Sequence, residues 1–112
     1  MKERTTEDAR NFAEAVAKHR KWKLNSDTDL VDPILDGLAA NFNSLGYYQC
    51  PCRDSWGSRD RDKDIICPCA YAQEDIGEFG QCFCGLYVSR AFLEEGREAS
   101  GIPERRPEDL YP

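Results

Sequence analysis

The sequence predicts a small, mainly α-helical protein that forms a single domain over residues 1–112. Two segments in the first half of the chain repeat apolar residues at steps of three and four positions, which is typical of the buried face of a helix. A chain of 112 residues is long enough to bury roughly two thirds of its unfolded surface in one core. No internal repeat of motif length occurs apart from three Cys-x-Cys units, which hold all six cysteines.

The first predicted helix is "TTEDARNFAEAVAKHRKW", residues 5–22. Thr5 or Thr6 can cap its start, and the acidic residues that follow suit the positive end of a helix dipole. Phe12, Ala13 and Val16 share one face and are expected to contact the core.

The second predicted helix lies in "NSDTDLVDPILDGLAANFNSLGYY", residues 25–48. We expect Gly46 to end it. We place Pro33 in the first turn, with Asp29 or Asp32 near the cap, because a proline in the middle of a helix costs about 3 kcal/mol. Apolar residues that recur along its expected buried face are Val31, Ile34, Leu35, Leu38, Phe42 and Leu45.

The rest of the chain gives weaker signals. We expect partial burial in the core for Trp22 and Trp56. The other assignments are a loop around Gly57 followed by a short helix from Ser58, a turn of helix and a glycine-containing loop in 70–81, an extended Leu86–Val88 and a helix in 89–100. Residues 101–112 are expected to form an irregular tail, or one that orders against a partner.

Charge and hydropathy exclude several classes of function. Charged residues make up 32% of the chain and its formal net charge is −6, which disfavours non-specific binding to nucleic acid. No stretch approaches the roughly 18 apolar residues of a membrane span. The acidic start resembles neither a signal peptide nor a transit peptide. We therefore expect a soluble cytoplasmic protein.

The three cysteine pairs are Cys50-Pro51-Cys52, Cys67-Pro68-Cys69 and Cys82-Phe83-Cys84. In a reducing compartment, clustered cysteines bind metal or carry out redox chemistry more often than they form structural disulfides. A zinc site uses four thiolates and usually has two to four residues between paired cysteines, so it leaves two cysteines unexplained. A 4Fe–4S cluster also takes four thiolates, and the two that remain are the number in one redox disulfide. All three interpretations stay open on the residues alone, and the count favours the cluster with a dithiol.

The order of these pairs resembles the catalytic chain of the ferredoxin:thioredoxin reductase family. The upstream segments "FAEAVAKHR" and "DTDLVDPILDGLA", and a glycine shortly before "CPCRD", extend the similarity over roughly residues 7–90. The resemblance implies a small, largely helical iron–sulfur protein with one 4Fe–4S cluster held in loops between helices.

The resemblance also implies a role for each cysteine. The cluster ligands would be Cys50, Cys67, Cys69 and Cys82, and the redox-active disulfide would join Cys52 to Cys84. Cys52 would attack the disulfide of the target protein, and Cys84 would stay near the cluster and later resolve the mixed disulfide.

The function that this implies is reduction of thioredoxin, or another protein disulfide, with electrons taken one at a time from ferredoxin or a similar donor. The family enzyme pairs its catalytic chain with a second, non-catalytic chain. The alternative from another class is a non-enzymatic zinc or iron–sulfur module for assembly or electron relay.

Two features depart from the family pattern. The spacers between pairs have 14 residues (53–66) and 12 residues (70–81), where the family has a longer first and a shorter second. Phe83 stands where the family has a histidine, which could exchange protons with the active thiols. Water, a carboxylate or a tyrosine such as Tyr87 is our candidate replacement.

Two basic features have a structural and a functional interpretation each. The segment "KHRKWK", residues 18–23, is either a docking patch for an acidic donor or an ordinary basic helix end, and His19 within it is expected to be solvated. Arg53 either lowers the pKa of Cys52 or pairs with Asp54 or Asp60 at the surface.

Overall fold

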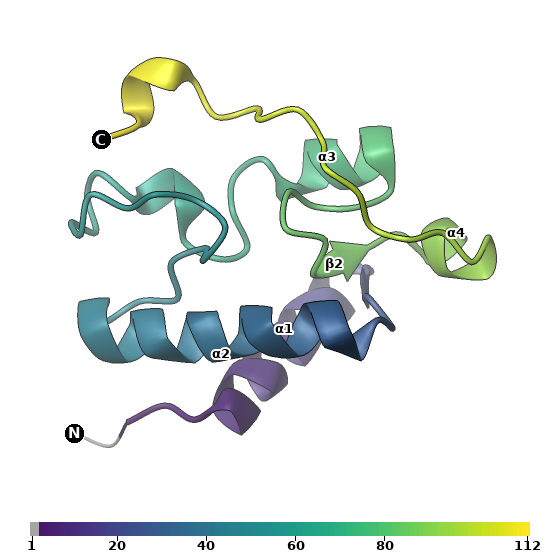
Figure 1. Cartoon of the computed structure of the whole chain (residues 1–112), viewed down its shortest axis with the longest axis horizontal. Coiled ribbons are helices and arrows are strands. Elements are labelled where there is room, and N and C mark those ends of the chain that lie inside the picture. Colours follow the sequence, from purple (N-terminus) through teal and green to yellow (C-terminus); the bar gives the residue numbers. More distant parts are fainter. Residues whose placement is uncertain (1–2) are drawn as a thin grey trace.

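The computed structural model describes residues 3–112, and helices dominate it (Figure 1). The elements in chain order are α1 (Thr6–Arg20), β1 (Lys23–Leu24), α2 (Thr28–Leu45), the 3-10 helix η1 (Lys63–Ile65), α3 (Ala72–Phe79), β2 (Tyr87–Val88), α4 (Arg90–Glu94) and the 3-10 helix η2 (Glu108–Leu110). The predicted mainly helical fold class is confirmed.

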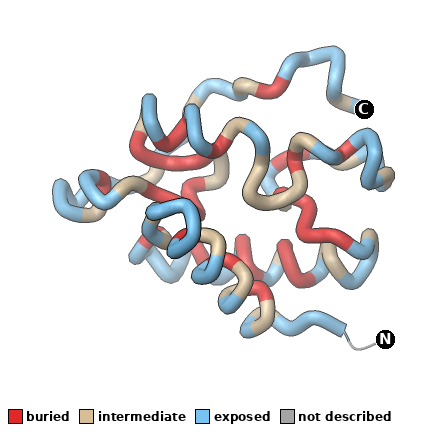
Figure 2. The backbone as a smooth tube through the Cα atoms, turned by 180° about the vertical axis from the view of Figure 1, so that it is seen from behind, coloured by how far each residue is buried: buried red, intermediate tan, exposed pale blue. Residues whose placement is uncertain are grey.

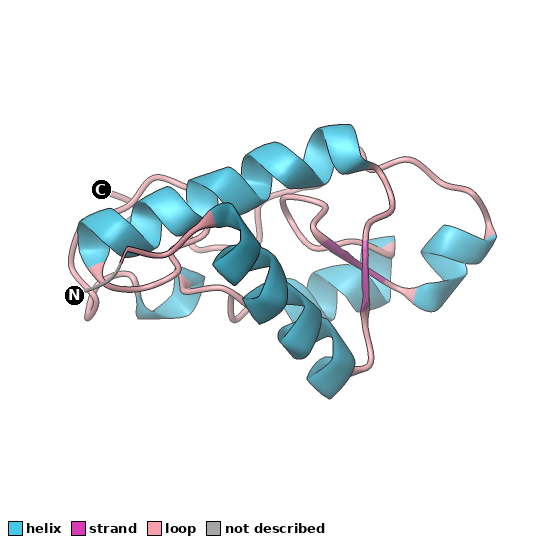
Figure 3. Cartoon of the chain, turned by 90° about the horizontal axis from the view of Figure 1, so that it is seen from below, coloured by secondary structure: helices cyan, strands magenta, loops and turns pink. Residues whose placement is uncertain are grey.

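Helix α1 begins with a capping box. The Thr5 side chain accepts a hydrogen bond from the Asp8 backbone, and the Asp8 side chain accepts one from the Thr5 backbone. A narrow stripe of alanines, Ala9, Ala13 and Ala17, faces the core, and Phe12 and Val16 flank it half-buried. These small side chains let α1 pack closely against α2, which crosses it obliquely (Figure 3).

The start of α2 differs from the prediction. Asp27 is the cap, and its side chain accepts a hydrogen bond from the Asp29 backbone, so Pro33 lies in the second turn instead of the first. The proline therefore removes one helical bond, to the carbonyl of Asp29, on the exposed side of the helix. At the other end, the prediction that Gly46 ends the helix is confirmed, because it adopts the left-handed conformation with φ 86°.

Strands β1 and β2 form a two-stranded antiparallel sheet that pairs Lys23 with Val88 and Leu24 with Tyr87. The extended conformation expected at Leu86–Val88 is confirmed for β2, whereas the sequence did not predict β1. The pairing joins the connection between α1 and α2 to the segment that follows the third cysteine pair. Buried Asn25 adds a bond from its side-chain amide to the carbonyl of Gly85.

The shorter elements differ from the prediction in their limits. The helix expected from Ser58 is only the 3-10 helix at Lys63–Ile65. Helix α3 takes eight residues of a segment that was expected to hold one turn, and α4 has five residues. Trp22 packs half-buried against the core as predicted, but Trp56 is exposed.

The core lies between α1, α2 and the loops that carry the cysteines. Figure 2 shows buried positions where these parts face one another and exposed positions around the rim. Leu35 and Leu38 of α2 and Leu86 and Tyr87 beside the third pair are all fully buried. In the part of the chain that the structure describes, no helix is both long and apolar enough to cross a membrane.

The last residues of the chain pack on the chain's own loops. In Figure 1 the yellow C-terminal segment runs past α3 and over the teal loop that follows the first cysteine pair. Arg105 forms ion pairs with three carboxylates of α3, and Arg106 pairs with Asp64 beside η1. The segment therefore has defined contacts within the chain, and its backbone is irregular apart from η2.

Candidate functional site

Backbone hydrogen bonds bring the first two cysteine pairs together. The amide of Cys50 donates to the carbonyl of Ile65, and the amide of Cys67 donates to the carbonyl of Tyr48. The third pair is closed by a bond from the Cys82 amide to the carbonyl of Tyr87. Loops that are far apart in the sequence thus place all three pairs around one centre.

Helix α2 fixes the position of the first pair through a close backbone approach. A Cβ atom at Gly37 would lie 2.8 Å from the Cβ of Pro51, the residue between Cys50 and Cys52. Only glycine leaves room for Pro51 against the helix. The site is therefore built onto the longest helix and not held by loops alone.

Five of the six cysteines line one small pocket. Four of them are the predicted ligands Cys50, Cys67, Cys69 and Cys82, and the fifth is Cys84; Arg53, Ala72, Phe83 and Tyr87 complete the lining. The predicted ligands are buried or half-buried. Cys52 is exposed at the surface.

The second members of the outer pairs lie next to each other. The sulfur atoms of Cys50, Cys52 and Cys84 all lie within 4.8 Å of one another, and the sulfurs of Cys82 and Cys84 are 3.9 Å apart. This group of three could hold a metal ion by itself. At such a distance the sulfurs of Cys52 and Cys84 could also form a disulfide bond with a small movement.

The two members of each outer pair differ in the direction of their pKa shift. Hydrogen bonding with Cys52 lowers the pKa of Cys50 well below its usual value, and the same interaction raises the pKa of Cys52 to about 12. In the third pair, where the two sulfurs are 3.9 Å apart, hydrogen bonding lowers the pKa of Cys82 and raises that of Cys84 well above its usual value. The first members are therefore the better thiolates.

The middle pair fits a metal cluster for a different reason. Burial raises the pKa of both Cys67 and Cys69. The thiolate form of each is therefore disfavoured unless a cation lies close to it. Iron supplies that compensation when it binds thiolates. The donor set of four sulfurs, in a pocket whose remaining lining is apolar except for Arg53, fits an iron–sulfur cluster.

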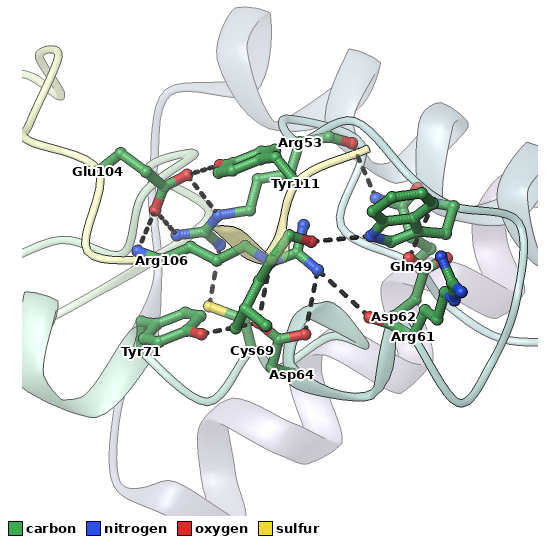
Figure 4. Close-up of polar contacts among 12 residues, drawn as sticks. Gln49, Arg53, Arg61, Asp62, Asp64, Cys69, Tyr71, Glu104, Arg106 and Tyr111 are labelled. Carbon is green, nitrogen blue, oxygen red and sulfur yellow. Dashed lines mark hydrogen bonds and ion pairs between the residues drawn. The ribbon is translucent and has the colours of Figure 1, made fainter. Parts of the chain in front are cut away.

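Arg53 is the functional residue whose place the sequence did not reveal. Its guanidinium is buried and paired with Glu104, and its Nη1 donates to the sulfur of Cys69 over 3.2 Å (Figure 4). The interpretation as a surface pair with Asp54 or Asp60 is therefore wrong, and the pKa of Cys52 is raised, not lowered. The only feature of the sequence that pointed to Arg53 was its position directly after a cysteine pair.

Phe83 and Tyr87 line the same pocket and contact different residues in it. The Phe83 ring packs against the Arg53 guanidinium, with 4.4 Å from Cζ to the ring centroid. The Tyr87 hydroxyl lies 3.4 Å from the sulfur of Cys67, a predicted ligand, and the Tyr87 amide donates to the sulfur of Cys82. Tyr87 as the replacement for the family's histidine stays a prediction.

Asp62 shapes the loop between the first two pairs. It is buried, and it accepts hydrogen bonds from the hydroxyls of Tyr47 and Ser55 and from the amides of Trp56 and Gly57. Burial alone would raise its pKa, but these bonds lower it. Nothing in the sequence distinguishes Asp62 from the other acidic residues near it as one with a structural role.

A shallow groove reaches the middle pair from outside. Its lining combines Phe12, Val16, His19 and Arg20 of α1 with Pro68, which stands between Cys67 and Cys69. The basic end of α1 also suits the helix dipole, so the structural interpretation of this segment holds as well.

Comparison with known proteins agrees with this arrangement. The catalytic chain of ferredoxin-thioredoxin reductase from Synechocystis sp. is 30% identical over 82 residues, which cover 71% of this chain and 66% of the relative. The corresponding chain from Guillardia theta is 27% identical over 86 residues, which cover 72% of this chain and 78% of the relative. This chain thus spans just under two thirds of the Synechocystis protein.

The family model described as "Ferredoxin thioredoxin reductase catalytic beta chain" matches residues 1–104. The match includes all six cysteines, both long helices and Glu104. The predicted family is confirmed, and its named relatives are catalytic chains of an oxidoreductase. The chain belongs to the ferredoxin thioredoxin reductase catalytic beta chain family.

Proposed function

We propose that this chain is a disulfide reductase that converts one-electron transfer into two-electron reduction of a protein disulfide. The observation that carries the proposal is the unequal surroundings of its cysteines. Cys52 is exposed, and Cys84 lies within 4.8 Å of it on the side of the pocket that the other four cysteines line. An exposed thiol with a partner behind it is what thiol–disulfide exchange needs.

Cys50, Cys67, Cys69 and Cys82 are the proposed ligands of one 4Fe–4S cluster. Their sulfurs share one pocket, and hydrogen bonding favours the thiolate form of Cys50 and Cys82. When bound, the cluster supplies one-electron chemistry beside the dithiol. The apolar lining from Ala72, Phe83 and Tyr87 limits access of water to the ligands.

The exchange itself uses Cys52 and Cys84. Hydrogen bonding with Cys50 raises the pKa of Cys52, so Cys52 first gives up its proton. Its sulfur then attacks one sulfur of the target disulfide, forms a mixed disulfide and releases the other sulfur as a thiolate. Cys84 then attacks the Cys52 sulfur, so the target leaves with both thiols reduced and a Cys52–Cys84 bond remains. Two electrons and two protons from outside restore the dithiol.

The proposed partners follow from the names of the relatives and from one surface. A ferredoxin-like donor and a thioredoxin-like target are the proposed pair, and a second, non-catalytic chain is a further candidate that turnover does not have to require. The groove between α1 and Pro68 is the proposed contact for the donor. Its basic neighbours Lys18, Arg20 and Lys21 complement an acidic protein on a chain that is acidic overall.

Turnover under anaerobic conditions tests the proposal. Reduced ferredoxin, this chain and an oxidised thioredoxin are combined, and the free thiols of thioredoxin are counted over time. We expect reduction that requires all three proteins. A colourless protein that binds one zinc ion and gives no reduction would instead support the non-enzymatic module.

A further inference from the structure

The side chain of Arg53 is completely buried although it follows the exposed Cys52 directly. A buried guanidinium stays charged and therefore needs partners for its donors. Its partners come from three distant parts of the chain, and Figure 4 shows two of them, Glu104 and Cys69, beside it. None of them is close to Arg53 in the sequence.

Glu104 fixes the orientation of this guanidinium. Nε donates to Oε2 and Nη2 donates to Oε1, each over 2.8 Å, which is a bidentate pair. Glu104 is held in turn by the amide of Arg106 and by the hydroxyl of Tyr111. The C-terminal segment therefore anchors the arginine.

The anchored guanidinium reaches the cysteine group with its third nitrogen. Because the guanidinium is planar and rigid, the two bonds to Glu104 determine where Nη1 points. It points to the sulfur of Cys69, 3.2 Å away. The guanidinium also lies over the face of the ring of Phe83, the residue between Cys82 and Cys84 in the sequence. One side chain thus links all three cysteine pairs.

We propose that Arg53, held in place by Glu104, is a positioning residue that sets the reduction potential of the cysteine-ligated centre. The inference rests on the proposed function, in which Cys69 is a cluster ligand. A hydrogen bond to a ligand sulfur and a nearby fixed positive charge both stabilise the more negative, reduced state. The Arg53–Glu104 pair therefore raises the potential above that of the same four thiolates without it.

The test measures the midpoint potential of the anaerobically purified holoprotein by a redox titration followed spectroscopically. Glu104→Gln weakens the anchor, and Arg53→Lys keeps the charge but loses the planar fork. Glu74→Gln and Arg97→Lys are the matched controls, because both residues form exposed ion pairs outside the cysteine group. Circular dichroism and iron content are recorded for every variant.

We expect the potential to shift to more negative values in Arg53→Lys, with no shift in either control. In Glu104→Gln the loss of a negative charge by itself raises the potential, so a shift to more negative values there reports the loss of the hydrogen bond from Arg53 to Cys69. The iron content of both test variants should stay near that of the wild type. An unchanged potential in both test variants, or an equal shift in the controls, overturns the inference. A wild-type protein without iron overturns the proposed function instead, so the two failures are distinguishable.

Discussion

At the residue scale, the two cysteines of an outer pair differ in their surroundings. Cys50 is buried and hydrogen bonding with Cys52 lowers its pKa, whereas Cys52 is exposed. The roles proposed for them follow from this difference, since a ligand must be shielded and an attacking thiol must be reached.

Two serine variants test that assignment of roles. Cys52→Ser should keep the cluster absorption and the iron content and lose disulfide reduction by at least about 100-fold, because the attacking thiolate is gone. Cys50→Ser should lose much of the iron. The measurements are iron analysis, visible absorption and thioredoxin reduction. Iron loss in Cys52→Ser with full iron in Cys50→Ser would show that the roles are reversed.

Residues that belong to a local sequence motif could be predicted, whereas residues whose role depends on contacts between distant segments could not. The three pairs and the family resemblance identified every cysteine of the pocket. Arg53 and Glu104 are separated by 51 positions, so no pattern in the sequence connects them. Phe83 likewise could be recognised as a departure from the family, but its contact with Arg53 could not be predicted.

At the element scale, the long helices have strong local signals, whereas of the two strands only β2 lies in a segment that was expected to be extended. Capping residues, periodic apolar positions and Gly46 predict α1 and α2 well. The cap of α2 was misplaced because several aspartates compete near its start, and only Asp27 accepts the capping bond. Strands β1 and β2 have two residues each and exist through their pairing with each other, which is not visible in either segment.

Helix α2 provides a prediction about how the site is supported. In Gly37→Ala the new Cβ would lie 2.8 Å from Pro51, so the first pair must move. We expect the free energy of unfolding to fall by about 1–2 kcal/mol, as overpacking outweighs the gain in helix propensity. Iron content should fall too. Urea unfolding and iron analysis measure both.

Gly77→Ala is the matched control in α3. A Cβ at Gly77 would meet no atom within 4 Å, so the change only improves helix propensity. It should raise the free energy of unfolding by about 0.5–1 kcal/mol and leave the iron content unchanged. Equal effects of the two substitutions would contradict the close approach of α2 to Pro51.

At the scale of the whole molecule, the C-terminal segment ties the loops of the site together. Glu104 binds Arg53 after the first pair, Arg106 binds Asp64 before the second pair, and Arg105 binds Asp75 in α3. Two of the three acceptors, Asp64 and Asp75, are largely buried. An irregular backbone is thus fixed by charged contacts, which hydrophobic periodicity cannot predict.

The pH dependence of the free energy of unfolding tests the contribution of Glu104 to these C-terminal contacts. Burial alone would raise the pKa of Glu104, but the bonds from Arg53 and Tyr111 lower it from the ordinary 4.5 to about 2. Its contribution is therefore complete above pH 4.5 and is lost as the pH falls toward 2. Glu104→Gln should be less stable than the wild type at pH 6.

That difference in stability should shrink as the pH is lowered from 4.5 toward 3. Urea unfolding of wild type and variant in parallel at each pH measures it, and acid effects common to both proteins cancel in the difference. A difference that stays constant from pH 6 to pH 3 would show that the carboxylate of Glu104 does not stabilise the folded chain through its charge.

We propose that four of the six cysteines hold a 4Fe–4S cluster and that the other two form a redox disulfide. The most direct test is the composition of the anaerobically purified chain, measured as iron, acid-labile sulfide and alkylatable thiols before and after reduction. We expect about four irons and four sulfides per chain, and two thiols that react with the alkylating reagent only after reduction. One zinc ion without labile sulfide would contradict it.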